Sequence, residues 1–128
     1  MKNNLLTGLI IVIIIFGFYK ITSKKPASLE VIQDNSDLIL FFGDTCPHCK
    51  DVEKFISENK IDQKIKISQR EVYSNKSNSA LFAKTVQGIC SDQLTPDGLP
   101  VPFLIDTKDK KCFVGTSPIE EYLTQKSN

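Results

Sequence analysis

The residues of this chain best suited to chemistry are two cysteines, Cys46 and Cys49, with Pro47 and His48 between them. Two cysteines at this spacing can close a small disulfide ring and exchange it with another thiol. A sulfur just before the start of a helix lies near unpaired N–H groups, which stabilise its thiolate. Cys46 is therefore the expected nucleophile. Cys49, one turn inside the helix, is the expected resolving thiol.

The histidine of this motif bears on the direction of the exchange. His48 can add positive charge or a hydrogen bond to the reduced form of the pair. A stabilised reduced thiolate makes the disulfide a stronger oxidant, so the Pro-His dipeptide favours donating disulfides over reducing them. The alternative is that His48 is only a solvated spacer.

A metal site at these cysteines is not expected. Zinc sites usually need a second close pair of ligands, whereas Cys90 and Cys112 stand far apart in sequence and His48 is the only histidine. Covalent haem attachment would need a histidine directly after the second cysteine, where Lys50 stands. We therefore expect no metal and no cofactor.

Four segments are predicted to form strands. Residues 37–43 hold a continuous apolar run that ends at Gly43, the pattern of a strand buried on both faces. Residues 65–72 alternate apolar and polar side chains, as a half-exposed strand does. Two further strands, 103–106 and 111–114, are joined by a lysine-rich turn and should form an antiparallel hairpin.

The helix that carries the cysteine pair has recognisable end signals. Asp44 and Thr45 can supply capping oxygens, and Pro47 suits the first helical turn. The helix is therefore expected to begin about Cys46 and to end near Asn59.

Two more helices complete the predicted order. The polar residues 75–79 precede a helix that ends near Ile89, and Ser117-Pro118-Ile119-Glu120 has the pattern of a capping box before the last helix. The order β-α-β-α-β-β-α predicts an α/β domain. Its sheet should be four-stranded and mixed, because the first two strands are joined through a helix and lie parallel, whereas the hairpin is antiparallel.

Charge is distributed unevenly along the 128 residues. The first 25 residues carry four lysines and no acidic residue, whereas the rest of the chain carries 12 basic and 15 acidic residues. A nucleic-acid-binding domain would need a clustered positive face. No nucleic-acid partner is therefore expected.

Residues 5–21 are predicted to cross a lipid bilayer. The run is apolar except for Thr7, two glycines and Lys20, and its length is at the lower limit for a spanning helix. The alternative is a cleaved signal peptide, although no Ala-x-Ala cleavage site is present. We divide the chain into an anchor or signal sequence (1–25), a linker (26–36) and a catalytic domain (37–126).

The cysteine motif and its surroundings resemble the thioredoxin superfamily. The resemblance covers about residues 36–125, and the residues that carry it are Phe41-Phe42-Gly43-Asp44-Thr45-Cys46-Pro47-His48-Cys49 and Val101-Pro102. Pro-His between the cysteines is typical of DsbA-type disulfide oxidases. The small size and the Val-Pro-Phe segment followed by a hairpin are closer to glutaredoxins. The resemblance implies a thioredoxin-like fold.

It also implies how substrate binds. The Val101–Pro102 peptide bond would be cis and face the disulfide, with the Val101 backbone free to pair with an extended substrate segment. Thr45, in place of the tryptophan of thioredoxins, would also border the substrate. The alternative is a trans proline in a plain turn.

Two positions depart from the family pattern. Leu40 stands where thioredoxins place a buried carboxylate, so a proton relay for Cys49 is missing or supplied by water. Gly115-Thr116-Ser117 lacks the aspartate with which glutaredoxins bind glutathione, so glutathione is a doubtful substrate.

Three interpretations are open for Cys90 and Cys112. Both can be small buried apolar side chains, or they can form a second disulfide between the second helix and the hairpin, or a relay to the active site. Sequence separation does not decide between these readings.

The expected function is that of a membrane-anchored, single-pass thiol–disulfide oxidoreductase. Its partners would be extended protein substrates with thiols or disulfides, and an unidentified redox partner that recycles it. An oxidising motif is most useful outside the cytoplasm, although the lysines around the anchor slightly favour the cytoplasmic side. The alternatives are a cytoplasmic-side, glutaredoxin-like reductase of glutathione mixed disulfides and a non-catalytic module that binds a peptide or a metal.

Overall fold

The computed structural model describes residues 36–128. The predicted membrane anchor, residues 5–21, and nearly all of the predicted linker lie outside these residues. Among residues 36–128, no helix is both long and apolar enough to cross a membrane.

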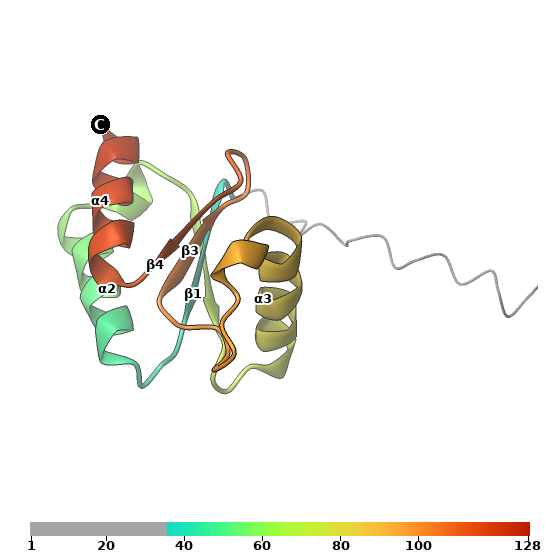
Figure 1. Ribbon diagram of the computed structural model, residues 1–128. Helices are drawn as coiled ribbons and strands as arrows, with labels where there is room; N and C mark the ends of the chain where they lie inside the picture. The colour runs from blue at the N-terminus through green and yellow to red at the C-terminus, as the bar shows by residue number, and fades with distance from the viewer. Residues whose placement is uncertain (1–35) are drawn as a thin grey trace, which may run out of the picture. The chain divides into compact units, whose positions relative to one another are not determined.

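One four-stranded mixed sheet forms the centre of the described domain (Figure 1). The strands stand in the order β2-β1-β3-β4. β1 pairs with β2 in parallel, and β3 is antiparallel to both β1 and β4. The predicted β-α-β-α-β-β-α order and mixed sheet are thus confirmed, and they are consistent with a thioredoxin-like fold. The strands are β1 (Leu38–Phe42), β2 (Ile67–Glu71), β3 (Phe103–Asp106) and β4 (Lys111–Val114).

Helices cover both faces of this sheet. In Figure 1, α2 and α4 lie together on one side of the strands and α3 lies on the other. The three helices are α2 (Pro47–Glu58), α3 (Lys76–Ile89) and α4 (Thr116–Ser127). Neither face of β1 is open to water, and this explains why its residues are apolar on both faces.

The two faces of β1 contribute to two separate apolar layers. Leu38 and Leu40 belong to the core formed with α2 and α4. Phe41, which points to the opposite face by strand alternation, stacks on Phe82 of α3 with ring centroids 4.4 Å apart. Phe82 in turn meets Phe103 edge-on at 5.2 Å. β1 is therefore the element on which both layers are built.

Two predicted helix caps are wrong. The N-cap of α2 is Cys46, whose sulfur accepts the N–H of Cys49, so the capping atom is neither an Asp44 nor a Thr45 oxygen. The side chains expected to cap α4 also do not do so, because α4 begins one residue before Ser117.

The early start of α4 has a backbone cause. Gly115 precedes the helix with a φ of 86°, a conformation that glycine adopts readily, and its N–H bonds to the carbonyl of Pro102 at 3.0 Å. The chain therefore turns into the helix directly after β4. Pro118 falls inside the first turn, where its missing N–H costs no helical hydrogen bond.

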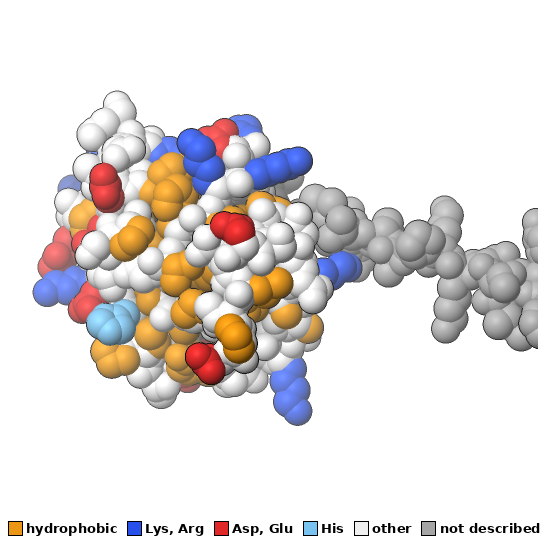
Figure 2. All heavy atoms as spheres, viewed as in Figure 1, with side chains coloured by type: hydrophobic (Ala, Val, Ile, Leu, Met, Phe, Trp, Pro, Cys, Tyr) orange, Lys and Arg blue, Asp and Glu red, His pale blue; other side chains and the backbone are white. Residues whose placement is uncertain are grey.

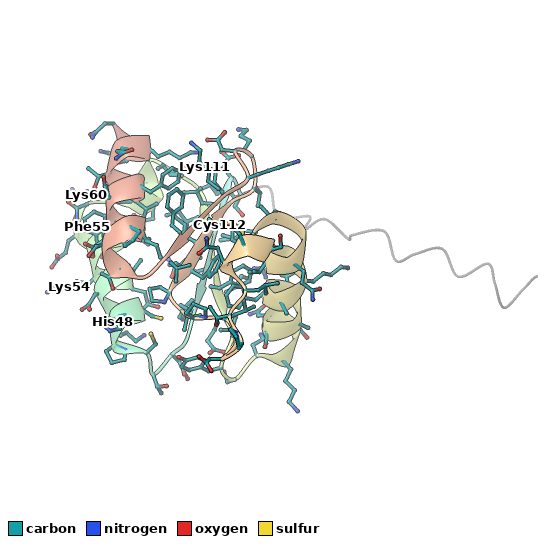
Figure 3. All side chains as sticks on the ribbon, in the orientation of Figure 1. His48, Lys54, Phe55, Lys60, Lys111 and Cys112 are labelled. Carbon is teal, nitrogen blue, oxygen red and sulfur yellow. A yellow bond between two sulfur atoms is a disulfide. The ribbon has the colours of Figure 1, made fainter. Side chains whose placement is uncertain are left out.

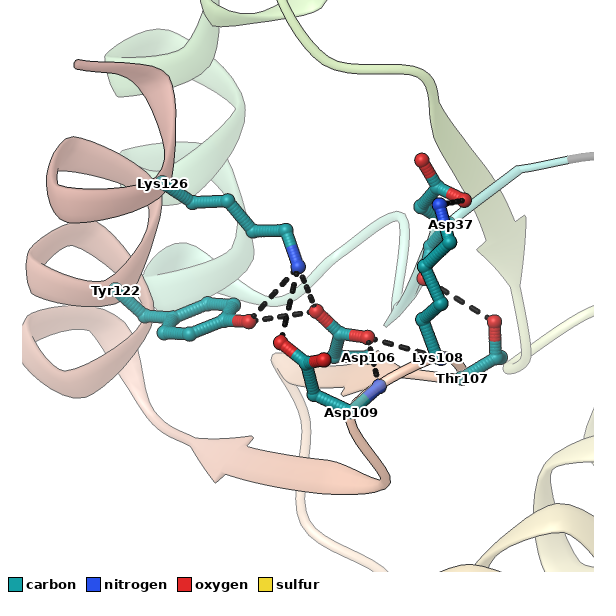
Figure 4. Close-up of polar contacts among 7 residues, drawn as sticks. All are labelled: Asp37, Asp106, Thr107, Lys108, Asp109, Tyr122 and Lys126. Atoms are coloured by element: carbon teal, nitrogen blue, oxygen red, sulfur yellow. Dashed lines mark hydrogen bonds and ion pairs between the residues drawn. The ribbon is translucent and has the colours of Figure 1, made fainter.

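A buried carboxylate at the end of β3 joins the hairpin to α4 (Figure 4). Asp106 is fully buried, and one of its oxygens accepts the N–H groups of Lys108 and Asp109 at 2.9 and 2.8 Å. The other oxygen accepts the Tyr122 hydroxyl at 2.6 Å and the Lys126 ammonium. Burial alone would raise the pKa of Asp106, but these hydrogen bonds outweigh it and lower the pKa.

Asp106→Asn should destabilise the domain, because it leaves the Lys126 ammonium without its buried counter-charge. We expect a loss of about 2–3 kcal/mol in the free energy of unfolding near neutral pH, measured by urea denaturation. The matched control is Asp109→Asn, whose carboxylate is 51% exposed and should contribute less than about 1 kcal/mol. Equal losses in the two variants would contradict a special role for Asp106.

The same contact predicts a pH dependence. Because the pKa of Asp106 is lowered in the folded state, its stabilisation is complete above the ordinary aspartate pKa of ~3.9 and is lost as pH falls through the folded value. The stabilities of the wild-type protein and the Asp106→Asn variant should therefore converge below about pH 4.

Candidate active site

The cysteine pair lies where β1 passes into α2. After Gly43 a short turn brings the chain to Cys46, whose N–H donates to the carbonyl of Gly43 at 3.1 Å. Helix α2 then begins at Pro47, with no N–H to leave unpaired. The strand end, the turn and the proline thus place one cysteine before the helix and the other in its first turn.

The two sulfurs differ in exposure and in hydrogen bonding. Cys46 is 7% exposed and Cys49 is fully buried, and both are free thiols. The Cys49 N–H donates to the Cys46 sulfur at 3.3 Å, and the Gly43 N–H donates to the Cys49 sulfur at 3.5 Å. Cys46 is therefore the outer sulfur and Cys49 the inner one, in the arrangement that the motif predicted.

The surroundings of the inner sulfur favour its protonated form. Burial, with a smaller contribution from the hydrogen bond to Cys46, raises the pKa of Cys49 to about 12, while the Gly43 N–H acts in the opposite direction. Since the thiolate and not the thiol is the nucleophile, Cys49 is unreactive near neutral pH until its environment changes.

A loop segment from before β3 faces the outer sulfur. The Val101–Pro102 peptide bond is cis, as the resemblance implied, and the Cys46 thiol donates to the carbonyl oxygen of Val101 at 3.7 Å. Pro102 is buried and Val101 half-buried. The Val101 backbone therefore lies directly beside the sulfur that would react first.

The other predicted site residues lie on the surface. The His48 side chain is 76% exposed at the start of α2, and its Nδ1 is 4.0 Å from Asp51 (Figures 2 and 3). Within residues 36–128, no hydrogen bond links the His48 side chain to either sulfur. The His48 backbone carbonyl accepts the Thr116 hydroxyl at 3.4 Å, which ties the motif to α4. Thr45 is exposed in the turn before the helix.

Sequence reasoning missed one residue at this site, Tyr73. The Val72 N–H bonds to the Phe42 carbonyl at 2.9 Å, so the chain after β2 runs beside the end of β1. The ring of Tyr73 then lies against Gly43, so closely that a Cβ at Gly43 would collide with it. The available signal was an aromatic residue just after a strand that runs parallel to β1, because parallel strands end at the same edge of a sheet.

Cys90 and Cys112 form a disulfide in this structure, with 6.1 Å between their Cα atoms. Cys90 ends α3, and Cys112, labelled in Figure 3, lies in β4 on the side facing α3. α3 starts near the active-site edge and runs back for 14 residues, or about 20 Å. The disulfide therefore lies toward the ends of β3 and β4 that are farther from Cys46.

Other features of the described residues lie apart from the dithiol. A hollow of about 150 Å³ lies between the last turns of α2 and α4 and includes none of the predicted site residues. Over residues 36–128, no three His, Cys, Asp or Glu side chains are grouped to hold a metal ion.

No protein-family model, curated protein or solved structure matches this chain. The chemistry and geometry of the dithiol are therefore the features that bear on its function.

Differential alkylation should separate the two thiols. At about pH 8, iodoacetamide should modify Cys46 in preference to Cys49, because only Cys46 retains any exposure, 7%, and the inner thiol keeps its proton. We expect Cys49→Ser to keep the fast reaction and Cys46→Ser to react at least about tenfold more slowly, as read by mass spectrometry.

Unfolding in urea provides the control, since it should make the two single-thiol variants react at the same rate. A folded Cys46→Ser variant that reacts as fast as Cys49→Ser would contradict the assignment of outer and inner sulfurs.

Proposed function

We propose that this chain is a thiol–disulfide oxidoreductase of the thioredoxin superfamily, a glutaredoxin-like small domain with a DsbA-like active site. One observation carries the proposal. At the start of one helix, a thiol that keeps a slight exposure faces a backbone carbonyl, and a fully buried thiol with a pKa of about 12 lies directly behind it. An outer thiol with a buried partner thiol within reach suits a two-step exchange better than a purely structural role.

When the protein is reduced, it exchanges its dithiol with a substrate disulfide in two steps. The Cys46 thiolate attacks one sulfur of a substrate disulfide, the substrate S–S bond breaks, and the departing substrate thiolate takes up a proton. Cys49 then loses its proton and attacks Cys46 in the mixed disulfide. This releases the second substrate sulfur as a thiol and leaves the Cys46–Cys49 disulfide. The substrate gains two electrons and two protons, which the dithiol loses.

Run in reverse, the same steps oxidise a substrate dithiol. The oxidised Cys46–Cys49 pair accepts two electrons, and a separate redox partner must then reoxidise it. His48 at the helix start would favour this direction by stabilising the reduced, negatively charged sulfur. Its exposed position leaves the imidazole free to approach Cys46 once a substrate binds.

Substrate is expected to bind along the Val101 backbone. The carbonyl oxygen of Val101 lies 3.7 Å from the Cys46 sulfur. An extended substrate chain paired with the Val101 backbone would therefore place a substrate sulfur close to Cys46. Thr45 and Pro102 would border this chain. Extended protein segments therefore fit the site better than glutathione, for which Gly115-Thr116-Ser117 has no aspartate.

The cellular setting follows from the sequence of the first residues. We propose that residues 5–21 anchor the protein in a lipid bilayer by a single pass, with the dithiol domain outside the cytoplasm, where oxidised cysteines persist. The alternative is a cytoplasmic reductase of glutathione mixed disulfides, and the reduction potential distinguishes the two.

Active-site variants test the two-step exchange. Cys46→Ser should abolish disulfide exchange with insulin, because no outer nucleophile remains. Cys49→Ser should accumulate a mixed disulfide with the substrate, because nothing resolves it, and non-reducing electrophoresis should reveal this species. Lys54→Ala, an exposed position on the same helix, is the matched control and should keep full activity.

Retained exchange in Cys46→Ser would contradict the proposal. A non-catalytic peptide-binding module would instead keep its ligand in that variant and show no turnover in the unmodified protein.

The reduction potential tests the direction. We expect equilibration with glutathione to give a value clearly above the ~−270 mV of thioredoxin and nearer the ~−120 mV of DsbA. His48→Ala should lower that value, because the reduced sulfur loses a stabilising charge. A value at or below that of thioredoxin would contradict the oxidase assignment and support the reductase.

A further inference from the structure

Tyr73 is an unassigned residue at the centre of the dithiol site. Its ring packs on Gly43, and Gly43 itself contacts both cysteines through its N–H and its carbonyl. Gly43 thus holds the phenol and the two thiols in one small cluster. Even so, Tyr73 is 58% exposed, so it is open to whatever approaches Cys46.

The turn that carries Tyr73 is held in place by a carboxylate. Glu71 accepts the backbone N–H groups of Tyr73 at 2.5 Å, Ser74 at 3.0 Å and Asn75 at 3.0 Å, together with the Ser74 hydroxyl at 2.6 Å. The Ser74 hydroxyl, followed by these N–H groups, lowers the pKa of Glu71 to about 2. The carboxylate therefore stays charged, and keeps the turn fixed, over the whole neutral range.

The protonation of the phenol suits it to donate a hydrogen bond. Burial raises the pKa of Tyr73, and the neighbouring charges of Cys46 and Cys49 raise it further. Asp44 acts in the same direction. The hydroxyl consequently keeps its proton near neutral pH.

We propose that Tyr73 is a catalytic residue whose hydroxyl donates a hydrogen bond to the Cys46 sulfur and stabilises its thiolate during exchange. The inference rests on the proposed function and deepens it. Stabilising the thiolate acts at two points: it raises the fraction of attacking sulfur, and it makes Cys46 a better leaving group when Cys49 reacts or a mixed disulfide is broken. This stabilisation by the Tyr73 hydroxyl adds to the stabilisation of the Cys46 thiolate by the N-terminus of α2.

The charged and titratable groups around Cys46 come from three elements. α2 contributes Cys49 and, at its surface, His48; the turn before it contributes Asp44; and the segment after β2 contributes Tyr73. Glu53, one turn further along α2, acts on Cys49. Of these groups, the phenol and His48 can stabilise a thiolate at Cys46, whereas the two carboxylates oppose it.

The test is the pH dependence of Cys46 alkylation by iodoacetamide in the full chain carrying Cys49→Ser, with and without Tyr73→Phe. Phenylalanine keeps the ring on Gly43 and removes only the hydroxyl. We expect alkylation about tenfold slower below the midpoint, a midpoint shifted to higher pH, and an unchanged rate where Cys46 is fully ionised. The ultraviolet absorbance of the thiolate should report the same shift.

Ser74→Ala in the same background is the matched control, since it removes a hydroxyl from the same turn and leaves the phenol in place. Its midpoint should stay at that of the Cys49→Ser parent. An unchanged profile in Tyr73→Phe would overturn the proposal, and so would equal shifts in both variants, which would assign the effect to the turn.

Insulin turnover separates this inference from the proposed function. A shifted alkylation profile without turnover in the unmodified protein would reject the oxidoreductase while supporting the Tyr73–Cys46 hydrogen bond. Insulin turnover that survives Tyr73→Phe, together with an unshifted alkylation profile in that variant, would support the oxidoreductase and reject the Tyr73–Cys46 hydrogen bond.

Discussion

The start of α2 leaves backbone N–H groups unpaired, and in this domain a sulfur atom accepts one of them. Helices more often take an oxygen from Ser, Thr, Asp or Asn at this position. Placing Cys46 there makes its thiolate the better partner of the helix end, because the partial positive charge at a helix N-terminus favours an anion. The local fold and the proposed reactivity therefore depend on one contact, between the Cys49 N–H and the Cys46 sulfur.

The second feature of the site is the contrast between two neighbouring thiols. Cys49 lies one turn inside the helix, against the end of β1, where burial opposes its ionisation. Gly43 contacts this sulfur through its N–H and leaves room for the Tyr73 ring, since any side chain at Gly43 would fill that space. The outer thiol thus bonds to backbone groups and keeps a slight exposure, whereas the inner thiol is fully shielded from water. In the proposed exchange, this contrast would give the two sulfurs different steps.

The contacts that join the hairpin to α4 and the candidate active site lie at opposite ends of the strands. β3 begins beside Pro102, next to Cys46, and ends at Asp106, whose hydrogen bonds join the hairpin to α4 (Figure 4). The Cys90–Cys112 disulfide also lies toward that distant end. The two central strands, β1 and β3, are almost entirely buried, so they give the site a rigid support, while His48, Thr45 and Tyr73 remain at the surface. Loops placed by a rigid scaffold commonly carry binding and catalytic residues.

Local patterns in the sequence were enough to predict the order of the elements, the mixed sheet and the position of the cysteine pair at a strand–helix junction. Hydrophobic periodicity reports burial, and the connection between two strands restricts how they pair. The packed chain alone decided that a thiol caps α2, that α4 starts at Gly115, that Cys90 meets Cys112, and that Tyr73 lies on Gly43. The last two join residues distant in sequence, and helix caps depend on backbone angles that residue types only bias. These features were decided by the distances and dihedral angles that the chain takes up on folding, because neither quantity is encoded in residue spacing.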